Sequence, residues 1–424
     1  MDVHASAAGR GILWISFVFP PIGGTQGLRM RRYLEEVSNV ASDSPIDVVT
    51  VQDRRITPQR DQGLESEIHP NIKVHRMSAG GLYRIRHRFR LDERAASDIR
   101  ASFKLVYMLL IYASTVAWVL RAALWILLHA RRQYGSVYVF VDPSASLSLG
   151  LLAALLNRNS RFVMEYCDGS IVLESEVSVL RGLAEKVERW SAARATGIVL
   201  RTHEAVIAYR RIHPSIPSGR FSVVFGGVDW DLYDGTPSEH NGGSEFTIAY
   251  TGTFYSHSAD PEPFFGALAR LADAQVPVRA VIAGDVDRRV MHTARSYQLD
   301  NVVRFTGHIP MSEVIDLQVS AHVLLTFGNY CPYRISSKLS QYVAARKPIM
   351  YVAVISNEPG AKLVSDSRRG VVAQNTVDSI ERALLDIYDS WKSGDICHSF
   401  ELSRTEQFSW KEVSGRVAAL VVSW

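Results

Sequence analysis

The chain has 424 residues, of which 47% are hydrophobic and 21% are charged, and its Lys and Arg residues outnumber Asp and Glu by four. This length predicts about two domains, and the composition is typical of a folded protein and excludes a disordered one. So small a charge excess argues against a strongly basic nucleic-acid-binding protein. The three cysteines are far apart and form no CxxC pair, which argues against a disulfide framework or a cysteine zinc site. The first residues lack the basic-then-apolar order of a signal peptide, so we expect a cytoplasmic protein.

The first half of the chain alternates short apolar runs with helical patterns. An apolar run at 11–19 leads into a Pro-Pro-Ile-Gly-Gly turn and then a helical pattern, which is the strand, glycine loop and helix that open a doubly wound unit. Further strands are predicted at 46–51, 137–141, 162–166, 197–200 and 221–225, with one more that ends near residue 74. Strands that alternate with helices predict a parallel sheet covered on both faces.

The segment 105–120 is uncharged, and the apolar run continues from 122 to 128. We expect a long, mostly buried helix, because Arg121 interrupts the run and the uncharged part is shorter than the roughly 20 residues that cross a bilayer. Just before it, four arginines alternate with aromatic and aliphatic residues between 83 and 91. This stretch is either a solvated loop or a surface that rests on the inner face of an anionic membrane, and the sequence leaves both interpretations open.

A polar, glycine-rich break at 233–245 predicts a linker between an N-terminal domain, 1–232, and a C-terminal domain, 246–410. After the break, strands are predicted at 246–250, 278–283, 302–305, 322–325 and 349–354, with amphipathic helices at 263–272 and 377–391. A last helix, within 411–424, is expected to pack back toward the N-terminal domain. The pattern predicts an α/β protein of two Rossmann-like, doubly wound parallel-sheet domains that face a central cleft, where ligands of such folds bind.

The segment 335–350 combines a helix start, a cation and a strand. Ser336 or Ser337 is predicted to cap the helix with its hydroxyl, which places Lys338 at the amino end, where free amides favour an anion. Gln341 and Tyr342 share its face because they follow three and four residues later. A phosphate of a nucleotide-bearing ligand fits this arrangement, and an ordinary capped helix before a strand explains the same residues equally well.

Four motifs, spread over nearly the whole chain, together resemble the GT-B glycosyltransferases, specifically glycosyltransferase family 4. They are the glycine loop with Arg29, Phe225-Gly-Gly-Val-Asp229, Ile248-Ala-Tyr-Thr-Gly-Thr253 and the segment from Ser337 to Ile349. The resemblance implies a GT-B fold and a role in polysaccharide or glycoconjugate biosynthesis. It further implies transfer of a sugar from a nucleotide-sugar donor to a glycan, lipid-linked or small-molecule acceptor, with retention of configuration and without a metal or other cofactor.

The resemblance also implies roles for single residues. Lys338 would stabilise the negative charge on the leaving diphosphate, and Asp168, after the strand at 162–166, would position or deprotonate the acceptor. An aspartate that caps the next element is nearly as good an interpretation of Asp168. The residues expected at the donor are Gly23, Gly24, Thr251, Gly252, Gly284, His308, Ser336, Ser337, Lys338, Gln341 and Glu358. Glu358 could instead cap the next helix.

Three departures from the family pattern leave other functions open. Gln341 stands where the family has an acid for the donor ribose, and Tyr333 stands where a second acid is frequent. The family's basic pair after the first strand of the donor domain is missing, and the segment 254–261 offers only His257. A degenerate protein that binds a nucleotide sugar or a partner glycosyltransferase without turnover is therefore an alternative. An epimerase of the same architecture is another, and the missing signal peptide argues against a periplasmic two-lobed binding protein.

No metal site is expected. Asp285-Val-Asp287 has the DxD form of a metal-binding motif, but it opens a predicted helix, so we interpret it as a helix-start acid.

Overall fold

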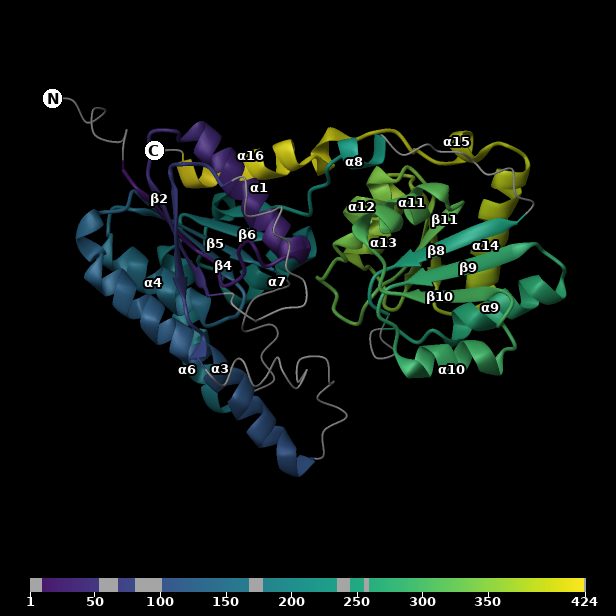
Figure 1. The fold of residues 1–424 in the computed structure, drawn as a ribbon, viewed down its shortest axis with the longest axis horizontal. Helices are drawn as coiled ribbons and strands as arrows, with labels where there is room; N and C mark the ends of the chain where they lie inside the picture. The colour runs from purple at the N-terminus through teal and green to yellow at the C-terminus, as the bar shows by residue number, and fades with distance from the viewer. Residues whose placement is uncertain are drawn as a thin grey trace. The chain divides into compact units, whose positions relative to one another are not determined.

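The structure is a computed structural model that describes residues 10–52, 68–80, 101–167, 178–234, 245–254 and 259–422, without the side chains of 101–114, 130 and 178–181. The chain divides into two compact units, Met1–Arg201 with Ala205–Phe225 and Trp410–Trp424, and Thr202–Glu204 with Gly226–Ser409. Each unit is built on one parallel sheet with helices packed against it (Figure 1). The predicted basic stretch at 83–91 and most of the predicted linker lie outside the described residues.

The first unit is built on a seven-stranded sheet in the order β3-β2-β1-β4-β5-β6-β7. Its strands are β1 (Ile12–Ile15), β2 (Ile46–Val51), β3 (Ile72–Met77), β4 (Ser136–Val141), β5 (Arg161–Tyr166), β6 (Gly197–Leu200) and β7 (Phe221–Val223). The strand order changes direction between β1 and β4, as in a doubly wound fold. β1 is shorter than predicted, because Ser16 begins the turn into the first helix and its hydroxyl donates to the Val18 carbonyl (2.6 Å).

Helices pack against this sheet on both faces. They are α1 (Gly24–Val40), α3 (Ala101–Leu128), α4 (Ser146–Leu156), α6 (Ser178–Arg194), α7 (His203–Ile212) and α16 (Trp410–Val422), with short 3₁₀ turns at Ala130–Arg132 and Ser218–Arg220. The C-terminal helix α16 packs on α1 and on strands β4 and β5, and it brings Trp410 and Val417 into one core with Trp14 and Tyr138. On the other face, α4 lies between α3 and α6.

The long helix α3 is less buried than the sequence predicted. Trp118, Ala122 and Ile126 are buried against the unit, whereas the opposite side of the helix carries an exposed apolar stripe. The stripe consists of Val116, Leu120, Leu124, Leu127 and Leu128, which are 48 to 71% exposed. Among the helices of the described ranges, none combines the length and apolar character needed to cross a bilayer.

The second unit is built on a six-stranded sheet in the order β10-β9-β8-β11-β12-β13. Its strands are β8 (Phe246–Thr251), β9 (Val278–Ala283), β10 (Val303–Gly307), β11 (Val323–Phe327), β12 (Ile349–Ala353) and β13 (Gly370–Gln374). The first five were predicted, and β13 was not, because its apolar run is only three residues long between Gly370 and Gln374. Two parallel, doubly wound sheets confirm the predicted fold class.

The helices of the second unit connect these parallel strands. They are α8 (Asp231–Asp234), α9 (Glu262–Asp273), α10 (Arg288–Ser296), α11 (Met311–Ser320), α12 (Lys338–Ala344), α13 (Pro359–Asp366), α14 (Val377–Lys392) and α15 (Ile396–Ser399), with a 3₁₀ turn at Glu406–Phe408. A single core of aromatic and aliphatic side chains joins the sheet to α9 and α14. Because all strands are parallel, their carboxyl ends meet at one edge of the sheet, which we call the carboxyl edge.

Candidate functional site

Two glycines shape the carboxyl edge of the second sheet. Gly252 follows β8 with a φ of +118°, and Gly284 follows β9 with a φ of +126°. The Gly252 amide donates to the Ala283 carbonyl (2.8 Å) and the Gly284 amide to the Gly307 carbonyl (2.8 Å), so the ends of β8, β9 and β10 stay paired. A Cβ at Gly284 would lie 2.4 Å from the Gly252 carbonyl oxygen. This edge therefore presents backbone without side chains, which suits the close approach of a ligand.

Lys338 lies against this edge as the first residue of α12. A Cβ at Gly252 would lie 3.1 Å from both its Cε and its Nζ, and the Nζ is 3.9 Å from the centre of the Tyr250 ring. Within the described residues, no carboxylate forms an ion pair with Lys338. Burial lowers the pKa of Lys338 to about 7, because a cation loses hydration in an apolar site. A cation without a counterion is thus held beside a bare strand end.

A buried hydrogen-bond network fixes α12 beneath β8. The Thr251 amide donates to the Tyr342 hydroxyl (3.0 Å), and the Gln318 side-chain amide donates to Thr251 Oγ1 (2.7 Å). The Tyr233 hydroxyl in turn donates to Gln318 Oε1 (2.9 Å). Tyr342 is one helical turn after Lys338, so this network sets the place of the lysine. The Thr251 hydroxyl is used inside the protein, where it positions the site.

The serines before α12 do not cap it as predicted. Ser337 occupies the N-cap position, but its backbone is already helical (φ −63°, ψ −21°), and its hydroxyl accepts no capping hydrogen bond. A capping hydroxyl needs an extended backbone to reach the amides of the first turn. Across the described part of the chain, the side chains of Ser336, Ser337 and Gln341 form no hydrogen bond, and all three residues are half-buried.

The buried carboxylate of Glu358 connects two loops of the carboxyl edge by hydrogen bonds. One carboxylate oxygen accepts hydrogen bonds from the amides of Val354 (2.5 Å) and Ile355 (2.9 Å). The other accepts from the Tyr351 hydroxyl (2.7 Å) and the Asn329 amide (3.1 Å). Glu358 precedes α13 but makes no side-chain bond to the amides of that helix. Its carboxylate ties the loop after β12 to the loop after β11.

Glu358→Gln is expected to destabilise the second unit by on the order of 2 kcal/mol, because an amide NH₂ cannot accept all four of these hydrogen bonds. The midpoint of thermal unfolding measures this change. Glu313→Gln, at an exposed position in the first turn of α11, is the matched control and should leave the midpoint unchanged. An unchanged midpoint together with lost donor binding would instead assign Glu358 to the ligand.

His308 and Asp287, which the sequence analysis also named in the second unit, lie in different environments. His308 is exposed, directly after β10. Asp287 caps α10, where its carboxylate accepts from the Arg289 amide (3.0 Å), which confirms it as a helix-start residue. The described ranges contain no group of three His, Cys, Asp or Glu side chains that could hold a metal ion.

In the first unit, the predicted glycine loop joins β1 to α1. Gly23 is the N-cap residue of α1, and Gly24 begins the helix with a φ of +81°. No side chain caps the helix, and its first turn has no acidic residue. The Gln26 side-chain amide donates to Asp142 Oδ2 (2.7 Å) and to Cys167 Sγ (3.4 Å), which joins the loop to the ends of β4 and β5. Asp168, the next residue, lies outside the described residues.

A buried ion pair lies under the same edge of the first sheet. Arg29 Nη1 is 3.1 Å from Glu165 Oε1, and both side chains are at most 4% exposed. The hydroxyls of Tyr138 (2.7 Å) and Tyr33 (3.4 Å) donate to the same carboxylate, and Arg29 also donates to the Phe225 carbonyl (3.4 Å). Charge and hydrogen-bonding capacity are matched, so we interpret this cluster as structural.

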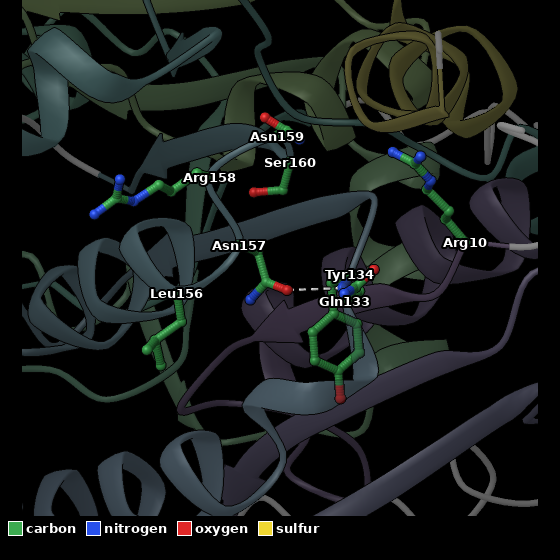
Figure 2. A pocket seen from close by; sticks show the side chains of 8 residues that line it. All are labelled: Arg10, Gln133, Tyr134, Leu156, Asn157, Arg158, Asn159 and Ser160. Carbon is green, nitrogen blue, oxygen red and sulfur yellow. Dashed lines mark hydrogen bonds between the residues drawn. The ribbon is translucent and has the colours of Figure 1, made fainter.

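A polar cavity of about 310 Å³ lies at the opposite, amino edge of the first sheet. Figure 2 shows the residues that line it: Arg10, Gln133, Tyr134, Leu156, Asn157, Arg158, Asn159 and Ser160. The Tyr134 amide donates to Asn157 Oδ1 (2.8 Å), which is the hydrogen bond drawn in the figure. The cavity is formed by segments that precede β1, β4 and β5, whereas doubly wound folds bind ligands where their strands end.

Comparison with solved structures identifies proteins of similar fold. HepE of Anabaena, crystallised with UDP and glucose, has a TM-score of 0.65 at 13% identity, over 98% of this chain and 100% of that chain. WaaG, described as a glycosyltransferase involved in lipopolysaccharide biosynthesis, has a TM-score of 0.60 at 12% identity, over 97% of this chain and 99% of that chain. A UDP-N-acetylglucosamine 2-epimerase has a TM-score of 0.56 at 12% identity, over 96% and 94%.

The chain has the two-domain GT-B fold of these proteins. At identities this low the likeness concerns the fold alone, and the fold is shared by transferases and an epimerase. No protein-family model matches the sequence, and no curated protein does. Membership of glycosyltransferase family 4 therefore stays a prediction.

Proposed function

We propose that the protein is a glycosyltransferase that moves a sugar from a nucleotide-diphosphate donor to an acceptor. The observation that carries the proposal is Lys338, a cation held beside the bare backbone of Gly252 and not paired with any carboxylate that the structure describes. Holding such a charge in an apolar site is unfavourable unless an anion arrives. A diphosphate is the anion that a nucleotide sugar brings to the carboxyl edge of a doubly wound sheet.

In the proposed reaction, the bond between the anomeric carbon and the donor's β-phosphate oxygen breaks, and its electron pair leaves with the diphosphate. The acceptor oxygen forms the new bond to that carbon, and Asp168 takes the acceptor's proton. Lys338 stabilises the charge that develops on the leaving diphosphate, in place of a metal ion. Ser336, Ser337 and Gln341 supply hydrogen bonds to the donor, and Gly23, Gly24, Gly252 and Gly284 leave room for its close approach.

We include retention of configuration in the proposal because the family that the sequence resembles transfers sugars with retention. It is tested by the anomeric form of the product, which proton NMR reports directly. A product with the opposite anomeric configuration to the donor would refute this part and leave sugar transfer intact.

The proposal is tested by ligand binding and turnover. A thermal-shift panel of UDP-, GDP- and ADP-sugars identifies the donor, because a ligand that binds the folded state raises its unfolding temperature. Release of the free nucleoside diphosphate is then measured with wild type and Lys338→Ala. Release that depends on Lys338 supports an enzyme, whereas binding without release supports the degenerate alternative. Interconversion of donors without any acceptor would identify an epimerase.

Donor binding is expected to weaken as pH rises above neutrality. The pKa of Lys338 is about 7 in the free protein, and a bound diphosphate favours the protonated form and so raises it. Affinity is therefore highest where the lysine is protonated, and it falls by up to about tenfold per pH unit above pH 7 until the raised pKa of the complex is reached. Calorimetric titration with UDP between pH 7 and pH 9 measures this. A Lys338→Met variant should show no such slope.

We further propose that the first unit contacts an anionic membrane surface, which would bring a lipid-linked acceptor within reach. The exposed stripe of α3 supports this, because five large apolar side chains share one side of the helix. Leu120 and Leu124 lie in its middle, and Arg121 is exposed beside them.

Wild-type protein is expected to pellet with phosphatidylglycerol-containing liposomes at low salt, and Leu120→Glu with Leu124→Glu to remain in the supernatant. Two added carboxylates oppose both the apolar contact and the anionic surface. Val40→Glu, at an apolar residue of α1 that is 57% exposed, is the control and should pellet like wild type. Wild-type protein that stays wholly in the supernatant would refute the membrane proposal.

A further inference from the structure

Arg201 is a buried cation that the structure leaves unpaired. It directly follows β6, at the carboxyl edge of the first sheet, and is only 8% exposed. Its Nε is fully buried without a hydrogen-bond partner, and its Cζ lies over the Phe225 ring, 5.7 Å from the ring centre. Neither an ion pair nor a hydrogen bond of its side chain is formed with any part of the chain that the structure describes.

The neighbourhood of Arg201 carries a surplus of positive charge. Arg29 lies close enough to repel it, and Glu165, the buried carboxylate beside it among the described residues, is already bound by Arg29 and two tyrosine hydroxyls. Burial, with the repulsion from Arg29, lowers the pKa of Arg201 to about 10. Two guanidinium groups thus lie near one carboxylate, and only Arg29 is paired with it. An uncompensated charge in such a site is strongly unfavourable, and an anionic ligand would remove the penalty.

We infer that Arg201 binds an anionic oxygen group, a phosphate or a carboxylate, of the acceptor. The inference rests on the proposed function, in which Lys338 of the second unit serves the donor diphosphate and the first unit serves the acceptor. A guanidinium group presents paired N–H donors that match a phosphate or carboxylate in two parallel hydrogen bonds. The acceptor is accordingly a phosphorylated or acidic molecule, and a neutral sugar does not satisfy the site.

The experiment separates this anion from the donor by loading the protein with UDP first. Sn-glycerol 3-phosphate, glycerate and glycerol are titrated by calorimetry into the UDP-saturated protein, as probes that differ only in their charged group. Phosphatidylcholine vesicles with and without phosphatidic acid form a second arm, which distinguishes a lipid headgroup from a soluble phosphate. The variants are Arg201→Met, Arg201→Lys and the control Arg158→Met, which removes an exposed guanidinium at the amino edge of the same sheet (Figure 2).

Wild type and Arg158→Met are expected to bind an anionic probe, in solution or on vesicles, and not glycerol. Arg201→Met should weaken that binding by about tenfold or more while leaving UDP affinity unchanged. Arg201→Lys should fall between them, because it keeps the charge but loses the paired donors. It also preserves the test if the methionine variant fails to fold.

Two results would overturn the inference. One is a wild-type protein, loaded with UDP, that binds no anionic probe. The other is an Arg201→Met variant that loses UDP affinity by the same factor as probe affinity, which would assign the guanidinium to the donor. If neither UDP nor GDP nor ADP binds wild type, the proposed function fails. In that case, Arg201-dependent binding of the probes to the unloaded protein would still establish the anion site.

Discussion

Replacing Lys338 by methionine is expected to weaken UDP binding about a hundredfold and, at pH 6, to make the free protein more stable by on the order of 2 kcal/mol. The two effects have one cause. The ammonium group lies over the Tyr250 ring and against Gly252, and no carboxylate of the described ranges pairs with it, so it is unfavourable in the free protein and favourable once a diphosphate is bound. Methionine keeps the volume of the side chain and removes the charge.

The effect of the unpaired Lys338 on the stability of the free protein depends on pH. The folded-state pKa of Lys338, about 7, lies below its ordinary value of 10.5. The unfolded chain therefore holds more protons between pH 7 and about 10.5, and the stability of wild type rises over that range. The advantage of Lys338→Met is complete below pH 7 and shrinks as pH rises. Thermal unfolding at pH 6 and pH 9, with Lys392→Met at an exposed helix end as the control, measures it. A methionine variant less stable than wild type at pH 6 would contradict the unpaired state of the lysine.

The place of Lys338 could be predicted from sequence, and its environment could not. A helix start is a local signal, since Lys338 follows two serines and precedes an apolar run that ends before Pro348. The Tyr250 ring and Gly252 come from a strand far earlier in the chain and reach the lysine only through the tertiary fold. The prediction that a serine caps α12 was wrong for a related reason. The backbone at Ser337 is helical, and the tertiary packing around it decides this backbone conformation.

Other parts of the site depend on contacts that no local pattern encodes. Glu358 was assigned either to the donor or to a helix cap, yet its four hydrogen-bond donors come from Tyr351 in β12 and from the loops after β11 and β12. Arg201 was not predicted as a site residue, because an arginine after a strand is common. Only the structure shows that it is buried and unpaired among the described residues. By contrast, the sheets were predicted almost strand for strand. Apolar runs between helices are strong local signals, and among the described strands only β13, with its run of three apolar residues, was not predicted.

The carboxyl edge itself depends on Gly284 more than on any other residue predicted at the donor. A Cβ there would lie 2.4 Å from the Gly252 carbonyl oxygen, and the φ of +126° is one that side chains rarely adopt. Gly284→Ala must therefore move the end of β9 away from β8. We expect a loss of stability of about 3 kcal/mol or more, together with weakened UDP binding, because Gly252 is part of the surface on which Lys338 rests.

Gly307→Ala separates the effect of backbone strain from the effect of a steric clash. Gly307 lies at the same edge with a φ of +71°, but a Cβ there would meet no atom within 4 Å. Its substitution should cost only about 1 kcal/mol, the strain of a left-handed backbone, and should leave UDP binding unchanged. Thermal unfolding and UDP titration of both variants measure the difference. If the two substitutions proved equally mild, the end of β9 could yield without disturbing β8, and the close contact of Gly284 with Gly252 would not be what holds the site in shape.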